Sequence, residues 1–121
     1  MIRRGSSLFL GLSALAACAH SARVANTSDT VRASYVWGPE VNEMKPCGSD
    51  STFWVLASPE IIGRLRVAQY NFQTTPYDRI FIRVRGQRSS QPTDGFAEQT
   101  NGYFEIRELL EVRRLAQGEC G

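Results

Sequence analysis

The chain begins with a short segment that we expect to be removed, so that only the residues after it must fold. Arg3 and Arg4 precede an apolar run from Leu8 to Ala17 that ends in small residues. A basic start, a short apolar run and small residues at its end are typical of a secretory signal peptide. The run is too short to cross a hydrocarbon core of about 30 Å as a helix. We therefore expect residues 1–17 to be cleaved, so that the following residues build the fold.

The residues Leu15-Ala16-Ala17-Cys18 resemble the bacterial lipobox. In that family the cysteine sulfur receives a diacylglycerol, the preceding peptide is removed and the new N-terminus is acylated. The resemblance implies that Cys18 begins the mature protein and anchors it to membrane lipid, and a thiolate is nucleophilic enough for this alkylation. Ala19 stands where enteric bacteria use aspartate as an inner-membrane retention mark, which favours the outer membrane. The alternative is an ordinary signal peptide with an incidental cysteine.

Residues 18–30 comprise the lipidated cysteine and a small, polar stretch without periodicity, which predicts a flexible tether. The chain has 14 Lys and Arg against 12 Asp and Glu, and Arg3 and Arg4 account for the whole excess. The mature protein is therefore electrically balanced. Because nucleic-acid binding depends on surplus positive charge, we expect no nucleic-acid partner.

Two cysteines remain for the folded domain once Cys18 is lipidated. Cys47 and Cys120 have one possible pairing, and an oxidising envelope compartment favours a disulfide between them. An unstrained disulfide that closes the long loop between these two cysteines stabilises a domain by about 4 kcal/mol in the chain-entropy model. A second interpretation makes His20, Met44 and Cys47 soft ligands for copper. Because this spacing is a weak metal pattern, we expect no metal and no cofactor besides the lipid.

Residues 31–121 carry a mostly β pattern with one helix. We predict strands over residues 34–41, 52–57, 79–86, 96–98 and 103–115, with the second strand pairing with the first. Ser58-Pro59-Glu60 starts a helix that ends near residues 70–71, and Asn101-Gly102 indicates a hairpin turn. One helix cannot cover both faces of such a sheet. We therefore expect a small OB-like five-stranded barrel with the helix closing one end.

The strand periodicity also predicts which side chains enter the core. In the strand over residues 79–86, Ile80, Ile82 and Val84 face one way, and Arg79, Phe81, Arg83 and Arg85 face the other. In the last strand we expect Phe104, Ile106, Leu110 and Val112 to point inward. Glu108 interrupts that face, which indicates a bulge. The large aromatic residues Tyr35, Trp37, Phe53 and Trp54 are expected in the core.

Several of these segments together resemble one family of envelope lipoproteins. They are Tyr35-Val36-Trp37-Gly38-Pro39-Glu40-Val41, Pro46-Cys47-Gly48-Ser49, Phe53-Trp54-Val55, Ile82-Arg83-Val84-Arg85-Gly86 and Leu110-Glu111-Val112 with Cys120. They look like the C-terminal OB-fold domain of NlpE-type lipoproteins. The resemblance implies an outer-membrane lipoprotein associated with adhesion, copper tolerance and envelope-stress signalling. Those proteins carry a further N-terminal domain with a Cys-x-x-Cys motif, in place of which this chain has only the tether, so that domain's copper or thiol activity is not carried over.

The residue inventory disfavours catalysis. His20 is the only histidine and lies two residues from the expected lipid, so no Ser/His/Asp or Cys/His arrangement can form in the domain. Glu105, Glu108 and Glu111 alternate with arginines, which predicts cross-strand ion pairs on a solvent-exposed sheet edge.

Binding surfaces are therefore the stronger expectation for function. Phe81, Arg83 and Arg85 form a candidate binding face, because OB barrels often bind ligands across a strand face. The favoured alternative is that Phe81 packs beneath the helix or a loop while the arginines face solvent, as charged strand faces usually do. We expect a non-enzymatic, lipid-anchored sensing or protein-interaction module with an envelope protein as its partner. The alternatives are a copper or redox sensor and a tethered inhibitor of a secreted hydrolase such as lysozyme. The inhibitor would use the loop over residues 89–94.

Overall fold

The computed structural model describes residues 30–121, together with Gly5 and Gly11. The predictions of a signal peptide, of lipidation at Cys18 and of a copper ligand at His20 lie outside the described residues. The ordered elements are strands β1 (Thr30–Gly38), β2 (Val41–Pro46) and β3 (Phe53–Leu56), helix α1 (Pro59–Phe72), strand β4 (Ile80–Arg88), the short 3-10 helix η1 (Gly95–Gln99) and strand β5 (Tyr103–Arg114).

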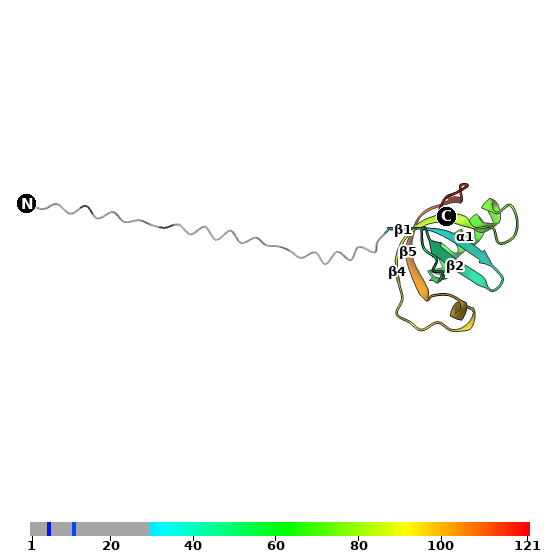
Figure 1. The fold of residues 1–121 in the computed structure, drawn as a ribbon, viewed down its shortest axis with the longest axis horizontal. Coiled ribbons are helices and arrows are strands. Elements are labelled where there is room, and N and C mark those ends of the chain that lie inside the picture. The colour runs from blue at the N-terminus through cyan, green and yellow to red at the C-terminus, as the bar shows by residue number, and fades with distance from the viewer. Residues whose placement is uncertain (1–4, 6–10, 12–29) are drawn as a thin grey trace, which may run out of the picture.

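The five strands close into a barrel in the order β1-β2-β3-β5-β4 (Figure 1). All neighbouring strands are antiparallel except β3 and β5, which run parallel. Helix α1 connects β3 to β4 and packs against β1, β4 and β5. The predicted small OB-like barrel with a single α-helix is confirmed.

The first predicted strand is wrong in its bounds, because residues 34–41 belong to two strands rather than one. β1 and β2 form a hairpin in which Gly38 pairs with Val41 across a turn at Pro39 and Glu40. Glu40 adopts a positive φ of 64°, which a turn of type II requires at the position after its proline. β3 consequently pairs with β2 and β5. The expected pairing of this strand with the first strand is therefore wrong. The Gly-Pro pair therefore marks a chain reversal, not a bend within one strand.

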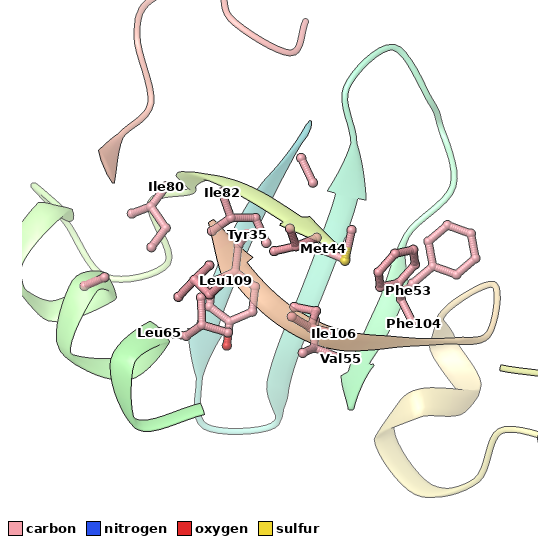
Figure 2. Packing of buried hydrophobic residues seen from close by; sticks show 13 residues of the cluster. Tyr35, Met44, Phe53, Val55, Leu65, Ile80, Ile82, Phe104, Ile106 and Leu109 are labelled. Carbon is pink, nitrogen blue, oxygen red and sulfur yellow. The ribbon is translucent and has the colours of Figure 1, made fainter. Parts of the chain in front are cut away.

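The core fills the barrel between the sheet and α1. Tyr35, Met44, Leu65, Ile80 and Ile82 are completely buried, and Figure 2 shows Leu65 of the helix pointing toward Tyr35 and Leu109. The predicted alternation in β4 is confirmed for its inward face, since Ile80, Ile82 and Val84 all have zero exposure. Of the four aromatic residues expected in the core, Tyr35 and Phe53 are buried, whereas Trp37 and Trp54 are only half-buried.

Strand β5 contains the predicted irregularity, and Val112 packs against the core as expected, but the inward position expected for Leu110 was wrong. Its pairing with β4 shifts between Arg83 and Val84 and again between Arg85 and Gly86. Each shift adds one residue to β5 and reverses the direction of the side chains that follow. Leu109 is therefore the buried residue at 6% exposure, and Leu110, which had been expected inside, is only half-buried.

The connection from β4 to β5 also differs from expectation. Residues 95–99 form η1 instead of a short strand. Asn101-Gly102 is not a hairpin turn, because it joins η1 to β5 and docks on the chain just before β3. The backbone N–H of Asn101 donates to the carbonyl of Thr52 at 2.8 Å, and its side-chain oxygen accepts from the Thr52 N–H at 3.0 Å. Figure 1 shows this connection extending from one end of the barrel.

Candidate functional site

The candidate binding face of Phe81, Arg83 and Arg85 is covered. Phe81 is 1% exposed, and the guanidinium groups of Arg113 and Arg32 lie over its ring at 3.9 and 5.3 Å from the ring centroid. Arg83 pairs with Glu111 at 3.2 Å and Arg85 with Glu108 at 3.3 Å. These are the cross-strand ion pairs expected for a solvent-facing sheet. The three residues do share one face, but Phe81 cannot contact a ligand while its cover is in place.

The C-terminal segment holds the two arginines that cover Phe81, Arg32 and Arg113, in position. The Glu119 carboxylate accepts hydrogen bonds from Arg113 at 2.7 and 2.8 Å and from Arg32 at 3.2 Å. The Arg113 hydrogen bonds, with a further one from the Ala116 N–H, lower the pKa of Glu119 to about 2. The next residue, Cys120, forms the predicted disulfide with Cys47. The face around Phe81 is thus part of the domain's own packing.

An open site lies where the β1–β2 hairpin meets the end of α1. A hollow of about 340 Å³ is lined there by the aromatic groove, which comprises Trp37, Gly38, Pro39, Arg66, Gln69, Tyr70, Gln73, Pro76 and Tyr77. Tyr70 is 81% exposed and Tyr77 is 54% exposed. Large exposed aromatic side chains gathered in one concave region are typical of a binding surface.

A buried glutamine forms the floor of the aromatic groove. Gln69 is 2% exposed. Its side-chain oxygen accepts from the backbone N–H of Trp37 at 3.1 Å, and its amide donates to the Asp78 carbonyl at 2.7 Å and to the Gln73 side-chain oxygen at 3.0 Å. Because buried polar groups are costly unless they are hydrogen-bonded, this network fixes the hairpin and the loop after α1 to the helix.

The loop over residues 73–78 is ordered by one carboxylate. Asp78 accepts hydrogen bonds from the backbone N–H groups of Thr74 and Thr75 and from the Thr75 hydroxyl, at 2.8 to 2.9 Å. These bonds, those from Thr75 foremost, hold the pKa of Asp78 below its usual value. Tyr77 then adopts a φ of 67°, a left-handed conformation that is unfavourable for a tyrosine. Such strain persists only where surrounding contacts impose it, so the loop presents the Tyr77 ring in a fixed position.

The polar atoms of the aromatic groove are mostly donors. The Arg66 guanidinium lies over the Trp37 ring at 4.5 Å from the centroid, and no carboxylate lines the hollow. The side-chain oxygens of Gln69 and Gln73 are already used as acceptors within the floor. Within residues 30–121 no side chain or backbone oxygen accepts a hydrogen bond from the Trp37 indole N–H, the Arg66 guanidinium or the Gln73 side-chain amide. The Tyr70 and Tyr77 hydroxyls can both donate and accept. A ligand with hydrogen-bond acceptors and an apolar surface would match this set.

The residues of the other candidate sites lie apart. Met44 is completely buried in the core, and the Cys47 sulfur is bonded to Cys120, so the structure does not bring Met44 and Cys47 together as open ligands. Within residues 30–121 no group of three or more His, Cys, Asp or Glu side chains is arranged to hold a metal ion. In the same part of the chain, no helix combines the length and apolar character needed to cross a membrane.

No protein-family model matches the chain, and comparison with curated proteins and with solved structures gave no match either. The site is therefore interpreted from its own geometry and chemistry.

Sequence reasoning missed the aromatic groove because its parts are far apart in the chain. Trp37 was assigned to the core, but it is half-buried and its ring lines the hollow. Tyr70 lies on the helix and Tyr77 in a loop that had been treated as a connection. The available signal was the placement of aromatic residues beside prolines, in Trp37-Gly38-Pro39 and Pro76-Tyr77.

Proposed function

We propose that the protein is a non-enzymatic, lipid-anchored interaction module of the bacterial envelope, which binds a partner protein through the aromatic groove. The anchor in this proposal is the diacylglycerol and acyl chain on Cys18, and the outer membrane is the expected location. The observation that carries the proposal is the cluster of exposed aromatic side chains on a rigid, concave surface.

The position of the aromatic groove suits a tethered module. β1 begins at Thr30, where the chain arrives from the tether, and ends at Gly38 in the groove. Strands rise by about 3.3 Å per residue, so roughly 26 Å separate the two ends of β1. In Figure 1, β1 starts at the left edge of the domain, whereas the β1–β2 hairpin and α1 lie on the right. A lipid attached before Thr30 would place the groove at the opposite end of β1 from the point of attachment.

The preorganised floor and loop support binding rather than packing. The hydrogen bonds of Gln69 and Asp78 hold the aromatic groove in its shape. A site that is already ordered loses less conformational entropy when it binds. Tyrosine and tryptophan are also the side chains that contribute most to protein interfaces.

Cross-linking in native envelopes tests this function with three variants of the full-length protein. Cys18→Ala removes the expected anchor, Tyr70→Ala removes the most exposed ring of the aromatic groove, and Phe96→Ala removes a ring that is 50% exposed on η1. We expect an envelope protein to be recovered with the parent and with Phe96→Ala, and to be lost with Cys18→Ala and Tyr70→Ala. Recovery that is unchanged by Tyr70→Ala would refute the role of the groove. Recovery of a secreted hydrolase through residues 89–94 would instead identify an inhibitor.

A further inference from the structure

We propose that the aromatic groove binds a proline-rich segment of the partner protein in the extended polyproline II conformation. This inference rests on the proposed function and names the ligand class of the same site. It follows from three properties of the groove: the shape of its walls, the chemistry of its free polar atoms and its single positive charge.

The walls of the aromatic groove are flat rings on separate elements. Trp37 comes from β1, Tyr70 from α1 and Tyr77 from the following loop. Pro39 and Pro76 continue the apolar lining beside them. A polyproline II helix has three residues per turn and a ridged apolar surface, and grooves lined by aromatic rings are the known mode for its recognition. The proline rings of such a ligand would pack between the separate aromatic rings of the groove.

The free polar atoms match the backbone of such a ligand. A polyproline II segment makes no internal hydrogen bonds, so its carbonyl oxygens remain available as acceptors, and proline residues carry no N–H donor. The groove is rich in donors: the Trp37 indole N–H, the Gln73 side-chain amide and the Arg66 guanidinium donate. The Tyr70 and Tyr77 hydroxyls can donate as well, and each glutamine oxygen already accepts one hydrogen bond within the floor. Donors and acceptors would therefore be satisfied together on binding.

The same arrangement disfavours a neutral glycan, the other common ligand of exposed aromatic rings. Each sugar hydroxyl is a donor as well as an acceptor, and ionised carboxylates are the acceptors that bind such donors most strongly. The aromatic groove has no carboxylate in its lining. Arg66 is exposed and forms no ion pair within residues 30–121, so an acidic residue beside the prolines would find a partner there.

Tryptophan fluorescence gives a direct test because the chain has two tryptophans. In full-length protein carrying Trp54→Phe, Trp37 is the only tryptophan, and selective excitation of tryptophan makes its emission a reporter of the groove. The probe is a peptide of about twelve residues with repeated Pro-x-x-Pro spacing and one aspartate. The control peptide has alanine at every proline position. We expect saturable emission changes with the proline peptide and an affinity at least about tenfold weaker for the alanine peptide.

The variants Tyr70→Ala and Phe96→Ala locate the binding surface. Loss of a buried aromatic contact at an interface commonly costs tenfold or more in affinity, so Tyr70→Ala should weaken the proline peptide at least about tenfold. Phe96→Ala should leave the affinity within about twofold. If Trp54→Phe alters the fold, amide chemical-shift changes of the unsubstituted protein give the same answer, and they should centre on Trp37, Gly38 and Tyr70.

Three results would overturn the ligand assignment. They are the absence of saturable binding, equal binding of the alanine peptide, and binding of an N-acetylglucosamine oligomer in place of the proline peptide. Recovery of a partner that depends on Tyr70, combined with any of these results, means that the interaction function stands and the ligand class is wrong. Proline-peptide binding combined with recovery unaffected by Tyr70→Ala means that the proposed function is wrong.

Discussion

Gly38 and Tyr77 are packed so closely that the tyrosine ring fills the space that any side chain at position 38 would need. An ideal Cβ atom on Gly38 would lie 2.5 Å from Cε1 of Tyr77 and 3.1 Å from its Cδ1. The hairpin turn thus fits against the loop after α1 only because position 38 has no side chain. Together with the positive φ of Tyr77, this contact fixes one wall of the aromatic groove.

Gly38→Ala should therefore weaken ligand binding more than it weakens the fold. The new methyl group would push the Tyr77 ring outward, because the exposed loop can move more easily than the paired strand. We expect at least about a fivefold loss of affinity for the proline-rich peptide, with cooperative unfolding retained. Titration of Trp37 emission in the Trp54→Phe background measures the loss.

Gly63→Ala is the matched control for this substitution. Gly63 lies within α1, and no heavy atom lies within 4 Å of a Cβ at that position. Replacing an exposed helical glycine with alanine typically stabilises a protein by about 1 kcal/mol. We expect a higher urea midpoint and unchanged peptide affinity. An affinity loss equal to that of Gly38→Ala would show that the loss does not arise from the Tyr77 contact.

Gly86→Ala should destabilise the barrel strongly. Gly86 is buried next to a register shift between β4 and β5, and a Cβ there would overlap the backbone carbonyl of Glu105. Paired backbone cannot yield as an exposed ring can, so the sheet would have to open locally. Overpacking of this kind typically costs about 1–3 kcal/mol. Urea denaturation should show a lower midpoint, and an unchanged midpoint would mean that β5 can shift at little cost.

Only part of this fold and of its aromatic groove could be predicted from the sequence alone. The alternation of apolar residues predicted strand β4, and Ser58-Pro59 predicted the start of the helix, because periodicity and capping are local properties. The resulting order of strands and one helix predicted the barrel. The bulges in β5 were not resolvable by period, since each added residue shifts the phase and moves Leu109 inside in place of Leu110. The aromatic groove is assembled from three separate elements, so no local pattern could reveal it.

Removing the disulfide should lower stability and loosen the cover over Phe81. Cys47 and Cys120 are separated by 73 positions, and in the chain-entropy model a loop of this length corresponds to about 4 kcal/mol. The double variant Cys47→Ser/Cys120→Ser should unfold at a clearly lower urea concentration than the oxidised parent. Chemically reduced parent protein should behave like this variant. Equal midpoints for all three proteins would exclude a stabilising role for the bond.

Protonation of Glu119 should release the same segment at acidic pH. Hydrogen bonds from Arg113 lower the folded-state pKa of Glu119 from 4.5 to about 2, so the folded protein binds fewer protons at this site than the unfolded chain. The resulting stability is fully present above about pH 4.5 and is lost as the pH falls toward 2. Glu119→Gln should therefore have a lower urea midpoint at pH 7 and a smaller further decrease between pH 5 and about pH 2.5.

Glu98→Gln provides the comparison for that pH profile. Glu98 is exposed on η1 and forms no ion pair within residues 30–121, so its variant should follow the parent at every pH. Increased accessibility of Phe81 in acid, detected by hydrophobic-dye binding, should accompany the loss in the parent. If the parent and Glu119→Gln lose stability in parallel down to about pH 2.5, the carboxylate does not hold the C-terminal segment, and the Phe81 cover depends on the disulfide alone.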